Sequence, residues 1–223
     1  MARPFLTLWI LVSTLWIACA PMKPHDSSSQ ADKLATRLST ANVADIANGL
    51  SADPQVSAIW NEYPDAGLYT TLVEDTRRPE PVRFAAALVL RSKSAEQFKK
   101  TNPQAIAQVL ATALKEDLAG SAAPWGWLWA SGDPVGLLGQ IFIEIGRPAR
   151  QSLEALLDDT TARDVYPGSE EATDMAMRRY RVKDFAAFYL AKIFKLDLPW
   201  ELDITKRDEA IATLRRRLQT ANP

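Results

Sequence analysis

Three tryptophans at alternate positions are the residues best suited to bind a ligand. Trp125, Trp127 and Trp129 lie in the segment APWGWLWA, residues 123–130, which we expect to be a loop between helices. Exposed indole rings can stack on a sugar face or hold an apolar anchor of a partner protein. The alternative is that the loop folds back and buries the rings as a plug. Burial of the three indoles decides between the two.

A second candidate region, residues 159–181, combines carboxylates with arginines. Its acidic residues do not reproduce the alternating oxygen ligands of an EF-hand, so we expect no metal there. The arginines can receive an acidic partner or a phosphate. The alternative is a solvated surface whose charges pair with one another. The candidate binding residues of this region are Tyr166, Arg178, Arg179, Tyr180 and Arg181.

Residue types argue against catalysis. His25 is the only histidine and Cys19 the only cysteine, and both precede the part of the chain that has a helical pattern. A Ser-His or Cys-His nucleophile and a histidine zinc site therefore cannot be assembled there. The sequence also has no phosphate-binding loop and no nucleophile elbow. We expect a protein that is not an enzyme and uses no cofactor; a hydrolase with two facing carboxylates is the alternative.

The N-terminus has the pattern of an export signal. Arg3 precedes an apolar run at residues 5–17, which is shorter than the eighteen or more residues that span a bilayer. Residues 1–18 are therefore predicted to be a signal peptide. Because Cys19 has no partner for a disulfide, its place at the end of the signal is better explained by lipid attachment.

Ile17, Ala18 and Cys19 resemble the last three positions of the lipobox of bacterial lipoproteins, with Trp16 where that pattern usually has Leu. The resemblance implies acyl chains such as palmitate on Cys19, and more than one chain gives stable anchoring. Ala20 implies, by the same resemblance, the outer membrane of a Gram-negative cell, with the protein facing the periplasm. Cleavage by ordinary signal peptidase and an uncleaved anchor are the alternatives.

Charge and composition narrow the partners. The chain has 26 basic and 27 acidic residues, and loss of Arg3 with the signal leaves 25 basic residues and a formal charge of −2. No basic excess is available to neutralise phosphates, so nucleic-acid binding is not expected. A hydrophobic content of 47% is enough for one domain with a continuous core.

Helical periodicity predicts a single all-α domain without a sheet at residues 33–223, after a flexible tether at residues 19–32 that is rich in Pro, Ser and charge. Residues 33–64 are expected to form an N-terminal cap of short helices. Residues 197–223 are expected to form a C-terminal cap, with a helix from Lys206 whose N-cap and N3 residues are Thr205 and Asp208.

Three helical hairpins are predicted between the caps, at residues 65–196. Their second helices start at Pro81, Pro134 and Arg181 and follow one template. A small residue at one fixed position lets neighbouring helices approach closely. In the three helices, the small residue is Ala86, Gly139 and Ala186, respectively. The inward position before it is Ala85, Leu138 and Phe185, and the inward position after it is Val89, Phe142 and Tyr189.

The clearest hairpin is at residues 133–159. Asp133 is a predicted N-cap with Pro134 at the first helical position, while Gly146 ends one helix and Pro148 starts the next. Each helix has one apolar stripe, and the two stripes consist of Leu138, Ile141, Phe142 and Ile145, and of Ala149, Leu153, Leu156 and Leu157.

The segments PVRFAAALVL and VKDFAAFYLAKI, together with residues 133–159, resemble the HEAT-like repeats of bacterial proteins. The resemblance covers about residues 65–196 and implies a short α-solenoid of helical hairpins with capping helices, a fold and not a reaction. The chain departs from the repeat pattern by extra length between first and second helices. The first link, at residues 76–79, has only about four residues, and the second and third links, at residues 117–132 and 159–180, are long. Because these links occupy one topological place, we expect them on one edge of the array.

These patterns favour a lipid-anchored scaffold of the cell envelope. It would be held to the membrane by its N-terminal lipid and bind a protein partner through the long inter-helix links. A glycan- or peptidoglycan-binding module that uses the tryptophans is the alternative from another class.

Overall fold

The computed structural model describes residues 27–49, 54–119, 127, 136–163, 179–199 and 201–220. Within these residues the chain has helices, one isolated antiparallel bridge between Ala162 and Arg181, and no strand. The all-α prediction is therefore confirmed. No described helix has both the length and the apolar character that crossing a bilayer requires.

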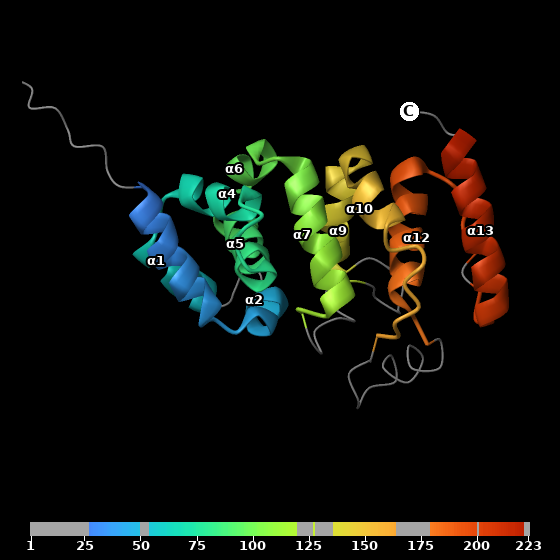
Figure 1. Ribbon diagram of the computed structural model, residues 1–223, viewed down its shortest axis with the longest axis horizontal. Helices are drawn as coiled ribbons and strands as arrows, with labels where there is room; N and C mark the ends of the chain where they lie inside the picture. The colour runs from blue at the N-terminus through green and yellow to red at the C-terminus, as the bar shows by residue number, and fades with distance from the viewer. Residues whose placement is uncertain are drawn as a thin grey trace, which may run out of the picture.

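The helices form a single row that begins with α1 and ends with α13 (Figure 1). The first part of the row consists of α1 (Ser27–Ser39), α2 (Val43–Gly49) and α3 (Pro54–Glu62). The central part consists of α4 (Ala66–Glu74), α5 (Glu80–Lys93), α6 (Ala95–Lys100), α7 (Pro103–Glu116), α9 (Leu137–Ile145), the 3₁₀ turn η2 (Arg147–Ala149), α10 (Arg150–Glu154) and α12 (Val182–Phe194). The last helix is α13 (Ile204–Thr220).

Three pairs of helices follow the predicted order: α4 packs on α5, α7 on α9, and α10 on α12. The first helices of the pairs, α4, α7 and α10, also contact one another in turn. All nine inward positions of the predicted template are buried. The shared pattern of the second helices therefore reflects a shared position in the core.

The turn between α9 and η2 has the predicted residues. Gly146 has a φ of +69°, which residues with side chains rarely adopt, and its N–H donates to the carbonyl of Phe142. Pro148 follows within η2. The predicted apolar stripes are buried apart from half-buried Ile145. The start of the hairpin differs: α9 begins at Leu137 after an extended Gly136, while Asp133 and Pro134 lie outside the described residues.

The two end helices have polar outer faces. On α1 the buried residues are Ala31, Leu34, Ala35 and Leu38, and on α13 the buried apolar residues are Ile211, Leu214 and Leu218. The exposed residues of α13 are mostly polar: Ile204, Thr205, Lys206, Glu209, Ala212, Arg216, Arg217, Gln219 and Thr220. Helices of this pattern shield the last apolar layer from water and do not offer a surface for a further layer.

The boundaries of both end helices depart from the predicted ones. Helix α1 begins at Ser27, inside the predicted tether, because Ala31 extends its buried stripe by one turn and Asp32 pairs with Arg78 at 2.5 Å. Residues 19–26 lie outside the described residues. Helix α13 begins at Ile204, where the carboxylate of Asp203 accepts the N–H of Lys206 at 2.9 Å.

The predicted N-cap pair of α13 is therefore wrong. Thr205 lies inside the first turn, and the carboxylate of Asp208 is bound by Arg181 instead of the helix end. The short helix α6 was not predicted at all. It has six residues and a single buried apolar side chain, Phe98, so it contains too little sequence for a periodic signal.

Gly139 is where neighbouring segments come closest. A Cβ atom at this position would lie 2.5 Å from the carbonyl oxygen of Trp127 and 2.6 Å from the hydroxyl of Tyr189 on α12. Real Cβ atoms do not approach other heavy atoms so closely, and one of the two neighbours is backbone. At Gly139 the close approach predicted for the small position is confirmed.

Substitution of Gly139 by alanine tests this contact. We expect Gly139→Ala to lower the free energy of unfolding by about 2 kcal/mol, because the cost of overpacking exceeds the gain in helix propensity. Urea denaturation monitored by circular dichroism measures the change. Gly67→Ala is the matched control: its Cβ would meet only the carboxylate of exposed Asp65, the N-cap of α4, at 3.1 Å, and the expected change is below about 1 kcal/mol. Equal effects of the two substitutions would contradict a tight contact at Gly139.

Candidate functional site

The described ends of the two long links lie at one edge of the row, which is the lower edge in Figure 1. We define this lower edge by the end of α7, the starts of α9, α12 and α13, and residues 117–119 and 159–163. Arg163 joins the two links: its Nε and Nη2 donate to the carbonyl of Leu114 at 2.9 and 2.6 Å, and Nη2 also reaches the carbonyl of Lys115. The third link therefore satisfies carbonyls at the end of the helix from which the second link leaves.

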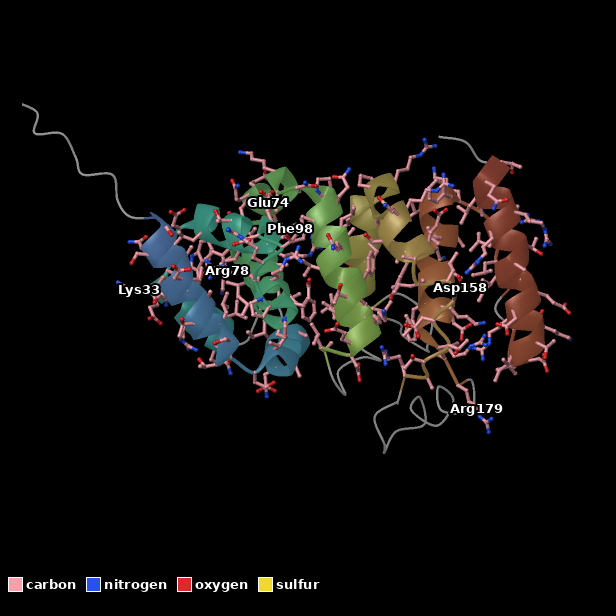
Figure 2. The ribbon with its side chains drawn as sticks, viewed as in Figure 1. Lys33, Glu74, Arg78, Phe98, Asp158 and Arg179 are labelled. Carbon is pink, nitrogen blue, oxygen red and sulfur yellow. The ribbon has the colours of Figure 1, made fainter. Side chains whose placement is uncertain are left out.

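The first link does not share this edge, so the prediction of one common edge holds only for the two long links. Glu74, at the end of α4, accepts the backbone N–H of Asn102 at the start of α7. Helix α7 has 14 residues and is about 21 Å long, so the first link begins one helix length away from Asp117. Figure 2 shows Glu74 in the upper part of the molecule and Arg179 at the bottom.

Backbone hydrogen bonds join the two ends of the third link. The N–H of Arg163 donates to the carbonyl of Tyr180 at 2.9 Å, and the N–H of Val182 donates to the carbonyl of Thr161 at 3.0 Å. Residues 164–178 lie between these closed ends and outside the described residues. Both described ends of the link, residues 159–163 and 179–181, which we call its roots, are thus attached to the helical body. Arg179 is exposed there and has a φ of +49°.

A buried charge network holds the second root of the third link. Arg181 donates through Nε and Nη2 to the carboxylate of Asp184, at 3.0 and 2.9 Å, and through Nη2 and Nη1 to that of Asp208, at 2.7 and 3.2 Å. Lys183 Nζ lies 2.8 Å from Asp208. The guanidinium of Arg207 lies over the ring of Tyr180. The network therefore joins the end of the link to both α12 and α13.

Asp208 in this network is held as an anion. Hydrogen bonds from Arg181 and Lys183 lower the pKa of Asp208 although partial burial opposes them. Burial alone would lower the pKa of Arg181, but its hydrogen bonds to Asp184 and Asp208 outweigh burial and raise it. Such groups do not exchange protons near neutral pH. Their arrangement suits structural pairing and not acid-base catalysis.

Trp127 anchors the second link. Its side chain is fully buried and packs on Phe142, with ring centroids 6.1 Å apart, while Phe142 stacks on Tyr189 at 5.1 Å. The hydroxyl of Tyr189 donates to the carbonyl of Trp127 at 2.6 Å, and the N–H of Gly136 donates to the same oxygen at 3.1 Å. Burial also raises the pKa of Tyr189, so its hydroxyl remains a donor.

The magnitudes explain why Trp127 stays buried. Its indole Nε1 has no hydrogen-bond partner among the described residues, which costs roughly 1–3 kcal/mol. Burial of about 200 Å² of indole surface contributes roughly 5 kcal/mol in the opposite direction. Apolar packing therefore outweighs the unmade hydrogen bond.

The predicted binding residues divide into three groups. Trp127, Tyr180 and Arg181 are buried and contribute to packing or pairing, so their side chains are not available on the surface. Arg179 is exposed at the lower edge. The remaining predicted residues lie outside the described residues: Trp125, Trp129, Tyr166, Arg178 and the lipidation residue Cys19. Burial of the loop as a plug is thus observed for Trp127. For Trp125 and Trp129 it stays a prediction.

Sequence reasoning missed Arg163, Asp184 and Arg207 as partners at this edge. Asp184 was detectable, since it follows Arg181 by three residues at a helix start, where such side chains meet. Arg163 carried no comparable signal. Its partners are backbone carbonyls nearly fifty residues earlier in the chain, so no local sequence pattern predicts them.

A cavity of about 210 Å³ lies at the edge opposite the long links. It is lined by Phe98, Pro103, Ile106, Ile145 and Pro148. Arg91 at its rim is paired with Glu144 at 2.6 Å and lies over the ring of Phe98. Pockets for small-molecule ligands usually exceed roughly 300 Å³. The cavity is therefore a weaker candidate for ligand binding than the lower edge.

Within the described part of the chain, no group of three His, Cys, Asp or Glu side chains is arranged to hold a metal ion. Comparison with known proteins adds no relative: no family model, no curated protein and no solved structure matches the chain. The candidate site therefore depends on the geometry of the chain itself.

The pKa of Asp208 predicts how stability depends on pH. Because this pKa is lower in the folded than in the unfolded chain, the pairing contributes stability above the unfolded value of about 4, and the contribution is lost as the pH falls through the folded pKa. We expect Asp208→Asn to lose roughly 0.5–1 kcal/mol at pH 7 and to weaken the decrease of stability below pH 4. Urea titrations at several pH values measure both effects. Glu209→Gln, an exposed neighbour, is the control; an unchanged pH profile of Asp208→Asn would contradict the pairing.

Proposed function

We propose that the chain is a short α-solenoid of HEAT-like hairpins with capping helices, and that it acts as a scaffold and not as an enzyme. The order of the three helix pairs and the burial of the shared template positions support this architecture. The polar outer faces of α1 and α13 suit helices that end such an array. A solenoid offers edges and faces for binding and needs no reactive centre.

We infer that a protein partner binds along the lower edge. The observation that carries this inference is that both long links are rooted there in fixed positions, by Arg163, Trp127 and Arg181. The exposed large apolar side chains of the described residues lie at the starts of α9 and α13 on the same edge: Leu137, Leu202 and Ile204. Fixed link roots beside exposed apolar side chains suit contact with a folded partner.

The proposal includes the lipid anchor predicted from the sequence. Acylation of Cys19 would hold the domain at the bacterial envelope, and the sorting resemblance favours the outer membrane and its periplasmic side. The near balance of basic and acidic residues disfavours nucleic acid as a partner. No cofactor enters the proposal.

The two alternatives gain less support. A glycan site built from three adjacent indoles loses one ring, because Trp127 is buried. A hydrolase needs one carboxylic acid with a raised pKa opposite a second carboxylate. Asp184 and Asp208 lie together but share Arg181, and the pKa of Asp208 is lowered.

Site-specific photo-crosslinking in intact cells tests whether a protein partner binds along the lower edge. A photoreactive phenylalanine derivative replaces Glu116 or Arg179, which are exposed at the lower edge, or Thr36 or Gln219, which are exposed on the outer faces of the end helices. We expect one crosslinked protein of the same mass from both lower-edge positions and none from the two controls. Equal crosslinking from Thr36 and Gln219, or none from Glu116 and Arg179, would contradict the proposal.

A further inference from the structure

The edge opposite the long links is also a continuous surface. We define this upper edge by the ends of α5, α9, α12 and α13, together with α6, the start of α7 and η2 (Figure 1). Arg91 joins the ends of α5 and α9 through Glu144, at 2.6 Å. Arg150 Nη2 donates to the carbonyl of Leu218 in the last turns of α13, at 2.9 Å. Its guanidinium also lies 5.4 Å from the ring centroid of Phe194 in the last turn of α12.

The carboxylates of this edge are largely neutralised by cations of the same edge. Glu144 pairs with Arg91, Glu96 with Lys99 at 3.2 Å, and Glu154 with Arg150 at 2.8 Å. Exposed Glu74 and Asp197 remain. Five exposed cations have no ion pair among the described residues, and they are Lys100, Arg147, Lys192, Lys195 and Arg217. The edge therefore has an excess of positive charge.

The lower edge differs in its use of charge. Of its cations, Arg163, Arg181 and Lys183 are bound to backbone carbonyls or to the carboxylates of the charge network. Lys115, Arg179 and Lys206 are exposed. The two edges therefore differ in net exposed charge: on the upper edge five exposed cations without an ion pair in the described part of the chain outnumber two exposed carboxylates, whereas on the lower edge exposed Lys115, Arg179 and Lys206 are matched in number by exposed Glu116, Asp203 and Glu209.

The chain enters the domain near the upper edge. Helix α1 begins at Ser27, and Figure 1 shows this end of α1 at the upper left, on the side of α6 and of the last turns of α12 and α13. Eight residue steps separate Ser27 from Cys19, so a fully extended chain places them no more than about 29 Å apart. An acyl chain on Cys19 would therefore leave the upper edge within reach of the bilayer.

We propose that the upper edge lies on an anionic phospholipid surface and that this contact points the two long links away from the membrane. The inference rests on the proposed lipid anchor and adds an orientation to it. Each basic residue near an anionic membrane strengthens binding by roughly five-fold. The attraction acts within about 10 Å of the surface, whereas the lower edge is one helix length, about 21 Å, further away.

The orientation of the lipidated full-length protein on vesicles tests the proposal. Acylation occupies Cys19, so an introduced cysteine is the only free thiol. Exposed Ala95 at the start of α6 and exposed Thr205 at the start of α13 are both neutral and lie on opposite edges. Each is replaced by cysteine and labelled with a fluorophore. Quenching by a quencher on lipid headgroups is compared on vesicles with and without phosphatidylglycerol.

We expect the label at Ala95→Cys to be quenched about five-fold more than the label at Thr205→Cys, on anionic vesicles only. The triple variant Arg147→Glu, Lys192→Glu and Lys195→Glu should reduce this ratio to about one, and so should high salt. Lys33→Glu, Lys115→Glu and Lys206→Glu form the matched control. They change the net charge equally at exposed positions away from the upper edge, and the ratio should persist.

Three results would overturn the inference. They are equal quenching of the two labels, a ratio that survives the upper-edge reversal, and the same ratio on vesicles without phosphatidylglycerol. An upper-edge reversal that keeps the orientation but abolishes a crosslinked protein in cells would assign the edge to an acidic protein instead. Failure of the anchor gives a different result: the unsubstituted protein would not float with vesicles, or Cys19→Ser would still fractionate with membranes.

Discussion

The contact among Gly139, Trp127 and Tyr189 is the constraint on which the rest of the architecture depends. The missing side chain at Gly139 lets the carbonyl of Trp127 and the hydroxyl of Tyr189 meet at 2.6 Å, inside the layer between α9 and α12. One contact therefore sets the spacing of two hairpins and attaches the second link to the core. A bulkier residue would separate the helices, and the indole would lose the packing that outweighs the lack of a hydrogen-bond partner for its Nε1 among the described residues.

Ion pairs and hydrogen bonds attach the third link to the helices, whereas apolar packing attaches the second link. Arg163 satisfies carbonyls at the end of α7, and Arg181 joins the link to Asp184 and Asp208. Asp208 also pairs with Lys183 at 2.8 Å and Asp184 with Arg207 at 3.2 Å, so each carboxylate has two cationic partners and the pairs join the link to both α12 and α13. The result is two long links whose described ends are held on one edge, and an opposite edge where five exposed cations have no ion pair among the described residues. We interpret the first as the surface for a partner and the second as the surface for a membrane.

The helices and their buried faces could be predicted because helical periodicity is a local property. The stripes of α9 and α10, the turn at Gly146 and the shared small position are all within a few residues of one another in sequence. The misses have non-local causes. Arg163 and Arg181 act through partners far along the chain, Trp127 occupies a space shaped by two other helices, and the first link leaves from the opposite end because α4 meets the start of α7. The sequence could mark Trp127, Tyr180 and Arg181 as candidate binding residues, but it could not decide whether their side chains are exposed or buried.

The solvent accessibility of Trp127 tests this account most directly. Hydroxyl-radical footprinting with mass spectrometry compares the oxidation rate of each tryptophan in the folded and in the urea-unfolded protein. We expect folding to slow the oxidation of Trp127 by at least about ten-fold, together with that of Phe142 and Tyr189, since all three side chains are fully buried. Oxidation of Trp127 at the unfolded rate, with Phe142 and Tyr189 still protected, would show that the second link is not anchored in the core and would contradict the account.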